Sequence, residues 1–389
     1  MRITEKNQLT SDKTLEEAKE MLCSFTGAKE VLFTGRAASG LYLALRLIRE
    51  KRKDIEVPEI ILPALSCSTA ANCAIMAGYK VRFADVNPQT ALPDPETMQA
   101  LAGPSTIALV FIHLFGNTTH LQQLAAWCKQ NNIALVEDLV HSVMPDTANT
   151  RCSGTFGDFV IFSFNAPKIL SGGGGALCMR DDAAIERIAA LLHEPPYKQA
   201  AEPALRKQLA LGYRHLHHQL VHHDRSGDGF DIHSFFMGIR QAFDALMWLP
   251  EVPAGFDPAK QLSGLSENYA RRMDKARIYL EALRDVEGIS VITSLGPGEN
   301  CWRFSFCIKQ AEKLFDFSEK LRNDGFHVSN LYWPPNRFFN PADACPNANK
   351  IARSIVNLWV DDAVSTAEVK ACLTSVQKHV NAMEHLSSK

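Results

Sequence analysis

The chain has 389 residues, a length that sets a prior of roughly two to three domains. Its 41 lysines and arginines nearly balance 43 aspartates and glutamates, which removes the composition-based case for binding nucleic acid or an anionic membrane surface. Apolar runs such as residues 107–112 are too short to span a bilayer, and the polar N-terminal stretch lacks a signal-peptide pattern. Ten cysteines without a C-x-x-C pair indicate reduced thiols, so we expect a cytoplasmic protein.

Short β-branched runs alternate with helical patterns between about residues 30 and 177. The runs that predict strands lie at residues 31–33, 59–64, 106–113, 133–138, 159–164 and 176–179. Repeated strand–helix units with short connections indicate an α/β fold, in which helices cover both faces of a mostly parallel sheet.

The composition changes twice beyond this region. Charged helical patterns replace the strands after Asp182, and the proline-rich stretch PEVPAGFDP follows Trp248. A long helical pattern, the strand-like runs ISVITS and CWRFSFCI, and a final amphipathic helix at residues 366–383 come next. We therefore predict a large domain over residues 1–248 and a smaller α+β domain over residues 249–389.

The stretch TGRAASG, Thr34 to Gly40, lies between the first predicted strand and a helix. Small residues allow a close approach to an anion, and the free N–H groups of a first helical turn bind one. The stretch matches neither the ATP-binding nor the dinucleotide-binding glycine motif. The alternative is a tight strand-to-helix turn without a ligand.

Glu137 and Asp138 end the apolar strand IALV, and His141 follows three residues later. Ligand sites of open α/β sheets lie beyond the carboxyl ends of strands, where an acid can meet a ligand cation. The alternative is that Asp138 caps the N-terminus of a helix.

The next strand, residues 159–164, delivers Ser163, and the chain reaches Lys168 five residues later and then the glycine run Gly172–Gly175. A partly desolvated lysine beside a glycine loop can have a lowered pKa and act as an amine nucleophile. An ordinary exposed lysine is the alternative, but consecutive glycines carry a high entropy cost and usually accommodate something. A phosphate cradle, a carboxylate and such a lysine are together the groups that pyridoxal 5′-phosphate needs.

In order and spacing, these motifs resemble the DegT/DnrJ/EryC1/StrS family of sugar aminotransferases, which have the fold type I of pyridoxal-phosphate enzymes. The resemblance spans about residues 30–380 and rests on the stretches TGRAASGLYLAL, IILPALSCSTAANCAIMAGYKVRFADVNP, VFIHLFGN, LVEDLVHSV, GTFGDFVIFSFNAPKILSGGGGAL and CPNANKIARSIVNL. It implies a mostly parallel seven-stranded sheet flanked by helices in the large domain, a smaller C-terminal α+β domain, and a homodimer with the active site at the interface.

Residue by residue, the resemblance implies that Lys168 holds the cofactor as a Schiff base and shuttles a proton, while Asp138 pairs with the pyridine nitrogen. His141 stands where the family usually has glutamine, near the O3′ side of the cofactor. The cofactor phosphate would be bound by Ser163 and by the backbone of Gly35, Arg36 and Ala37.

Three positions depart from the family pattern. Cys67 replaces the aromatic residue that usually stacks on the pyridine ring, and Arg36 replaces the usual threonine of the phosphate turn. Asp231 stands in place of an asparagine that would approach the phosphate of the partner subunit. The resemblance therefore identifies a divergent member of the family.

We accordingly predict a pyridoxal-phosphate-dependent aminotransferase that moves an amino group from a glutamate-like donor to a nucleotide-linked keto sugar. The dehydratase branch of the family replaces the lysine by histidine, so Lys168 argues against dehydration. Two alternatives stay open: an aminotransferase for an amino acid or another small non-sugar ketone, and a non-catalytic member that binds the cofactor.

Two further patterns and one histidine have weaker interpretations. The cluster His215–His223 places three histidines on one helical face, which could chelate zinc, but a solvated helix face explains it and we expect no metal site. The segment Tyr332–Arg337 resembles a substrate-proximal loop whose rings and arginine would suit a sugar and an anion, and a proline-fixed surface turn is the alternative. We expect His113, at the end of its strand, to be structural.

Overall fold

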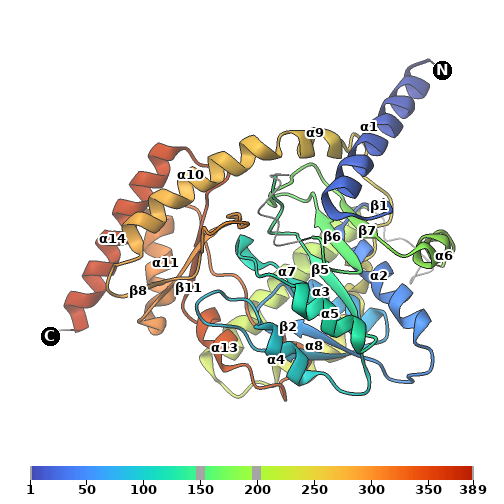
Figure 1. Ribbon diagram of the computed structural model, residues 1–389. Coiled ribbons are helices and arrows are strands. Elements are labelled where there is room, and N and C mark those ends of the chain that lie inside the picture. Colours follow the sequence, from blue (N-terminus) through green and yellow to red (C-terminus); the bar gives the residue numbers. More distant parts are fainter. Residues whose placement is uncertain (1, 146–153, 195–202, 388–389) are drawn as a thin grey trace.

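The computed structural model describes residues 2–145, 154–194 and 203–387. Within these ranges two β-sheets lie side by side, a large one on the right of Figure 1 and a small one on the left. The strands of the large sheet are β1 (Glu30–Thr34), β2 (Glu59–Pro63), β3 (Lys80–Ala84), β4 (Thr106–Ile112), β5 (Ala134–Asp138), β6 (Phe159–Ser163) and β7 (Gly175–Met179). The strands of the small sheet are β8 (Ile289–Val291), β9 (Phe304–Ile308), β10 (Val328–Ser329) and β11 (Ile355–Leu358).

The large sheet has seven strands in the order β1-β7-β6-β5-β4-β2-β3. All neighbours are parallel except β7, which runs antiparallel to both β1 and β6. Every residue of β4, β6 and β7 is buried, which is typical of strands covered on both faces. The mostly parallel sheet expected from the sequence is confirmed, and β3 adds a strand that the predicted runs did not include.

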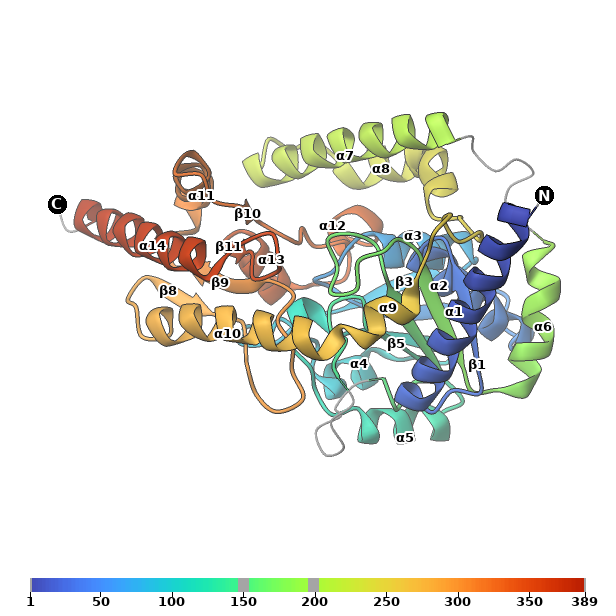
Figure 2. The same ribbon diagram turned by 90° about the horizontal axis from the view of Figure 1, so that it is seen from above.

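Helices cover both faces of the large sheet and one side of the small sheet (Figures 1 and 2). Their bounds are α1 (Arg2–Thr26), α2 (Ala37–Lys51), α3 (Thr69–Met76), α4 (Pro95–Leu101), α5 (Gln122–Gln130), α6 (Asp182–Leu192), α7 (Pro203–Ser226), α8 (Ile232–Ile239), α9 (Pro258–Ser263), α10 (Leu265–Leu283), α11 (Leu314–Asn323), α12 (Asn336–Phe339), α13 (Pro346–Ala352) and α14 (Thr366–Ser387). The first of them was not predicted, because its N-terminal half is polar and apolar residues are widely spaced in its sequence; among the side chains that the structure describes, Ala18, Leu22 and Phe25 of this helix are buried.

The small sheet is antiparallel, with the order β10-β11-β9-β8, and α10, α11 and α14 pack beside it. The buried apolar side chains of this sheet and of the helices beside it, Phe304 and Phe317 among them, form a hydrophobic core separate from that of the large sheet. However, α12 and α13 pack against the large core through residues such as Phe338 and Ile351, although they follow β9 and β10 in the sequence. The chain thus returns to the large core after β10. The domain boundary expected after residue 248 stays a prediction.

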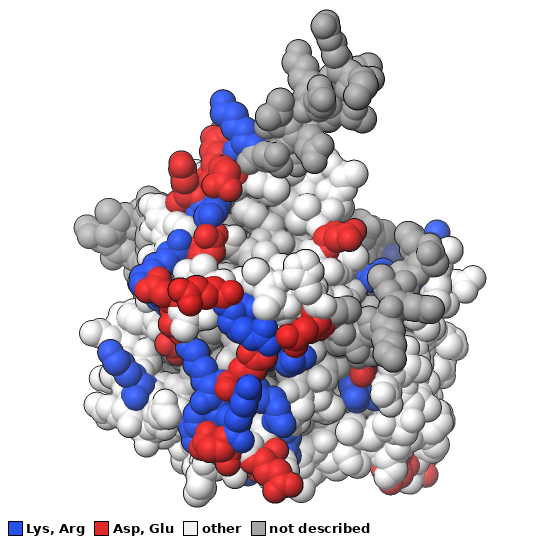
Figure 3. All heavy atoms as spheres, turned by 90° about the vertical axis from the view of Figure 1, so that its right-hand side faces the viewer, with Lys and Arg blue, Asp and Glu red and all other residues white. Residues whose placement is uncertain are grey.

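The surface carries both signs of charge. Basic and acidic side chains interleave over the face that Figure 3 presents. Some of them form ion pairs between helices, as Arg187 of α6 does with Glu50 of α2 at 2.8 Å. No helix among the described residues is long and apolar enough to cross a membrane.

Candidate active site

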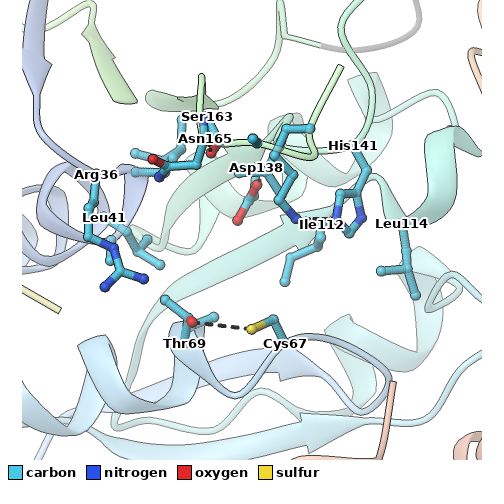
Figure 4. Close-up of a pocket in the computed structure, with 17 residues that line it drawn as sticks. Arg36, Leu41, Cys67, Thr69, Ile112, Leu114, Asp138, His141, Ser163 and Asn165 are labelled. Atoms are coloured by element: carbon cyan, nitrogen blue, oxygen red, sulfur yellow. Dashed lines mark hydrogen bonds between the residues drawn. The ribbon is translucent and has the colours of Figure 1, made fainter. Parts of the chain in front are cut away.

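A cavity of about 410 Å³ opens at the carboxyl ends of β1, β4, β5 and β6. Seven of the eight residues that the sequence singled out line it: Arg36, Ala37, Cys67, Asp138, His141, Ser163 and Lys168. Figure 4 shows Arg36 at one side of the cavity, His141 and Leu114 at the other, and Asp138 between them. We refer to Arg36, Ala37, Ala38 and Ser163 as the anion end, and to Asp138, His141 and Lys168 as the amine end.

The anion end is the start of α2. Arg36 is the N-cap residue in an extended conformation, and no side chain caps the helix there. The first-turn residues Ala37 and Ala38 line the cavity, as does Ser163 at the end of β6. A helix N-terminus without a capping side chain offers N–H groups and a positive dipole end to an anion. The Arg36 guanidinium also lies here and donates a hydrogen bond to the carbonyl oxygen of Leu246.

Gly35 lies behind the cavity rather than on its wall. Its N–H donates to the carbonyl oxygen of Leu249 at 2.9 Å, and a Cβ at this position would lie 2.3 Å from the carbonyl oxygen of Glu251. A glycine is therefore required at position 35, because the segment of residues 249–251 packs directly against the backbone of this turn. Its predicted contact with a phosphate stays a prediction, and this N–H already has a partner.

Asp138 presents a buried carboxylate at the end of β5. The side chain is 7% exposed, and it accepts the N–H of Val140 at 3.0 Å. A turn rather than a helix follows, so the helix-cap interpretation of Asp138 is wrong. Burial raises the pKa of this carboxyl to about 6. A cation placed beside it in the cavity would oppose this effect and favour the ionised form.

Lys168 approaches His141 from the loop after β6. Its Nζ lies 2.6 Å from Nε2 of His141. Although part of the side chain faces the open cavity, the protein atoms packed around the amine lower its pKa to about 8, with Arg303 adding to this effect and Cys67 and Asp138 opposing it. Such an amine exchanges its proton readily near neutral pH.

His141 is buried and neutral. Burial, followed by the charge of Lys168, lowers the pKa of this histidine well below its usual value. Nε2 therefore accepts the hydrogen bond from the ammonium group of Lys168, and the proton of the ring lies on Nδ1. This Nδ1 is buried and has no hydrogen-bond partner among the described residues. An oxygen atom of a bound ligand would satisfy it.

Three aromatic residues outside the predicted site complete the amine end. The ring of Trp302 stacks on His141 with a centroid distance of 3.8 Å and an interplanar angle of 4°. The hydroxyl of Tyr332 lies 3.3 Å from Nε2 of His141, and Phe115 is nearly parallel to all of these rings. Tyr332 belongs to a segment that the sequence had marked, whereas nothing in the sequence pattern pointed to Trp302 or Phe115.

A sequence model described as the DegT/DnrJ/EryC1/StrS aminotransferase family matches residues 1–215 and 258–377 of the chain. The chain belongs to this family. It is therefore an aminotransferase, and its cofactor is pyridoxal 5′-phosphate, as the sequence predicted. The buried carboxylate, the amine of low pKa, the orphaned Nδ1 and the uncapped helix start are the donor and acceptor set that this cofactor requires.

Several known proteins are similar to this chain. A dTDP-4-dehydro-2,3,6-trideoxy-D-glucose 4-aminotransferase of Saccharopolyspora spinosa is 24% identical over 93% of this chain and 86% of its own length. Among solved structures, PseC of Helicobacter pylori, an aminotransferase involved in the biosynthesis of pseudoaminic acid, superimposes with a TM-score of 0.72 at 18% identity, covering 94% of this chain and 90% of that chain. TlmJ, an aminotransferase of Streptoalloteichus hindustanus, superimposes with a TM-score of 0.69 at 23% identity, covering 94% and 90%. The fold expected from the sequence is confirmed.

The segment Tyr332–Arg337 differs from the prediction. Arg337 pairs with the buried carboxylate of Asp224, at 2.5 Å for the shortest contact, and Trp333 donates its Nε1–H to the same carboxylate at 2.7 Å. Arg337 and Trp333 were expected to contact a substrate. Instead, Arg337 neutralises the carboxylate of Asp224 at the end of α7, and Trp333 donates a hydrogen bond to it. Only Tyr332 of this segment is turned toward His141.

Glu137, next to Asp138, is a structural residue in this family member. Its carboxylate accepts the N–H groups of Gly154, Phe156 and Gly157 at 2.5–2.7 Å, and it lies 3.3 Å from Nε2 of His113. These bonds hold the pKa of Glu137 below its usual value despite burial. The pair fixes the loop before β6, and His113 has the structural position expected for it.

The remaining candidates lie away from the cavity. No cluster of three or more histidine, cysteine, aspartate or glutamate residues within the described part of the chain could hold a metal ion. His223 instead pairs with Asp228 at 2.6 Å. Asp231, which replaces an asparagine of the family pattern, is the N-cap of α8 and accepts the N–H of Ser234 at 3.0 Å. Helix capping explains an aspartate at this position.

Proposed function

We propose that the protein transfers an amino group from a glutamate-like donor to a keto sugar linked to a nucleotide. The observation that carries the proposal is one cavity lined by an uncapped helix start, the buried carboxylate of Asp138 and the half-buried amine of Lys168. The sugar is inferred from relatives such as the Saccharopolyspora enzyme above and a UDP-4-amino-4,6-dideoxy-N-acetyl-beta-L-altrosamine transaminase of Campylobacter jejuni, which is 28% identical over 47% of this chain and 48% of its own length.

In this proposal each end of the cavity has one task. When bound, pyridoxal phosphate supplies a ring that accepts the electrons of a carbanion. The N–H groups of Ala37 and Ala38, the Arg36 guanidinium and the Ser163 hydroxyl hold its phosphate. Asp138 would pair with the ring nitrogen, which would keep that nitrogen protonated and the carboxylate ionised.

Lys168 would hold the cofactor through its amine, and the same amine, when free, would accept and return the proton that the reaction moves. Its amine is suited to both directions of transfer, since its pKa is about 8. His141 orients that amine through Nε2, and its Nδ1–H, which has no partner among the described residues, would donate to an oxygen of the cofactor. A buried and neutral histidine does this without adding a charge that would repel the ammonium group.

The proposal includes a homodimer in the cytoplasm, with the active site at the interface. The helical hairpin of α7 and α8 exposes large apolar side chains, which are Leu205, Leu211, Phe230 and Phe235. In Figure 2 these helices lie along one edge of the molecule. An exposed apolar surface of this kind favours a second copy as its partner. Light scattering on the purified protein tests this part, and a monomer would contradict it.

An absorbance spectrum of the purified protein with pyridoxal phosphate tests the catalytic part. We expect a band near the visible edge that glutamate removes and that a nucleotide-linked keto sugar restores. Lys168→Ala should lack the band, whereas Lys260→Ala, which changes a lysine outside the cavity, should retain it. If small keto acids restored the band and nucleotide-linked sugars did not, the sugar substrate would be wrong. A band that no amine changed would indicate a non-catalytic member.

A further inference from the structure

Trp302 reaches the amine end from the small sheet, just before β9. It is 2% exposed, and its ring covers the ring of His141 face to face at 3.8 Å. No other described aromatic ring lies as close to His141. A residue of the small domain therefore forms the surface against which the histidine of the large domain is fixed.

The same indole contacts Lys168 in two ways. The Nζ atom lies 4.6 Å from the centroid of the Trp302 ring, within the range of a cation–π interaction. The indole Nε1–H donates to the carbonyl oxygen of Pro167 at 2.7 Å, which fixes the peptide immediately before the lysine. The Trp302 side chain thus contacts both the backbone just before Lys168 and the amine at the end of the lysine side chain.

The loop after β4 holds Trp302 in turn. The carbonyl oxygen of Phe115 accepts the N–H of Trp302 at 2.9 Å, and that of Gly116 accepts the N–H of Asn300 at 3.1 Å. The two chains approach so closely that a Cβ on Gly116 would lie 2.1 Å from the carbonyl oxygen of Asn300. The side-chain amide of Asn300 also donates to the carbonyl oxygen of Val143 at 2.5 Å. These bonds join the small domain to the edge of the large sheet from which the site is built.

From these contacts we propose that Trp302 is a positioning residue for the reaction, which holds the Lys168 amine beside His141 and excludes water from it. The inference rests on the proposed role of Lys168. Trp302 does not exchange a proton itself. Its ring covers the amine and keeps water from it, and its N–H restricts the backbone from which the lysine extends. The small domain thereby contributes to the proton-transfer step without lining the cavity.

Reactivity of the lysine in the cofactor-free protein tests this inference directly. Competitive acetylation with acetic anhydride, read by mass spectrometry of the Lys168 peptide across pH, reports the pKa of the amine. Trp302→Ala should admit water and raise that pKa by about one unit, because burial is the main cause of its lowering, so acetylation at pH 7 should slow about tenfold. Trp302→Phe keeps the aromatic face and the burial and should retain a pKa near 8. Trp127→Ala, in α5, is the control and should change nothing.

A second variant displaces Trp302 without replacing it. Gly116→Ala forces the chain at Asn300 away from the loop, whereas Gly325→Ala adds the same methyl group at a glycine of similar φ, +95° compared with +102°, with no atom nearby. We expect Gly116→Ala to slow acetylation of Lys168 and Gly325→Ala to leave it unchanged. An unchanged acetylation profile in both Trp302→Ala and Gly116→Ala would overturn the positioning role.

Activity separates the positioning role from the proposed function. In the loaded enzyme, Trp302→Ala should lower kcat about ten- to a hundredfold with little change in KM, and deuterium at the α-carbon of the donor should give a larger isotope effect than in the parent. Trp302→Phe should recover much of the rate. A rise in KM alone, without a change in kcat or the isotope effect, would contradict positioning. Failure of the parent protein to capture pyridoxal phosphate on Lys168 would contradict the proposed function instead, whatever the acetylation profiles show.

Discussion

The two ends of the cavity are built in different ways. The anion end consists of the turn after β1, the first residues of α2 and the end of β6, and much of its chemistry comes from backbone N–H groups. The amine end consists of side chains whose pKa values burial has shifted, and it is completed by Trp302 and Tyr332 from the small domain. One end depends on local chain geometry, and the other depends on contacts between distant parts of the chain.

This difference predicts how each end responds to substitution. Backbone N–H groups remain when a side chain is replaced, so changes at the anion end should weaken cofactor affinity by degrees. Buried ionisable groups stabilise one another, so changes at the amine end should abolish or strongly slow the chemistry. The following predictions test this contrast, beginning with the largest expected effect.

Lys168→Ala should lower the rate of the donor half-reaction on the order of 10⁴-fold, because both the covalent attachment and the proton transfer use this amine. Stopped-flow absorbance with glutamate measures it. Added methylamine should restore part of the rate, since a free amine can carry the proton. A loss of less than tenfold would show that another group moves the proton.

Asp138→Asn should slow the reaction by about 10²- to 10³-fold, because a neutral amide cannot keep the ring nitrogen protonated. The same substitution should raise the free energy of unfolding of the cofactor-free protein. The pKa of Asp138 is raised from 3.8 to about 6, so the folded protein binds more protons than the unfolded chain between these values and the ionised carboxylate destabilises the fold above pH 6.

In the cofactor-free protein the variant should therefore gain stability over the parent as pH rises from 4 to 7, by roughly 3 kcal/mol at most. Urea unfolding at both pH values measures the gain. Asp182→Asn, at an exposed site on α6, is the control and should show no such trend. A difference that stayed constant with pH would mean that Asp138 ionises as an ordinary carboxyl.

Arg36→Ala should weaken cofactor binding about ten- to a hundredfold, the range expected for losing a charged hydrogen bond to phosphate while the helix N–H groups remain. Dissociation of the cofactor on dilution, followed by absorbance, measures the effect. Arg187→Ala, which removes a surface ion pair, should leave the affinity unchanged. If Arg36→Ala reduced kcat as strongly as Asp138→Asn, the contrast between the two ends would be wrong.

Cys67→Phe should tighten cofactor binding by about two- to tenfold, because an aromatic side chain adds a stacking surface for the pyridine ring. Cys67 lines the cavity and is exposed, with its Sγ 3.2 Å from Oγ1 of Thr69. Alkylation of Cys67 by iodoacetamide should accordingly be slower when the cofactor is present. Equal alkylation rates with and without the cofactor would show that the ring lies elsewhere.

Much of the large sheet could be predicted from the sequence, because buried parallel strands are continuous apolar runs. The runs ending at Asp138 and Ser163 became β5 and β6, and their carboxyl ends bring together residues that are far apart in the chain. β3 was missed because exposed Lys80 and partly exposed Arg82 interrupt its apolar pattern. In the segment Tyr332–Arg337 only Tyr332 reaches the site, and nothing in the sequence indicated that Arg337 pairs with Asp224, because Asp224 lies on a helix more than a hundred residues earlier.

The sequence by itself determined the order of the sheet-forming segments, the glycine turn, and the candidate carboxylate and lysine, because strand burial and helix starts leave local patterns. Only the tertiary structure decided that Gly35 packs behind the cavity, that Asp224 takes up Arg337, and that Trp302 covers His141 and Lys168. These contacts join residues that are far apart in the sequence and meet at or beside the large hydrophobic core. They depend on how distant segments of the chain pack together, and that packing leaves no periodic signal along the sequence.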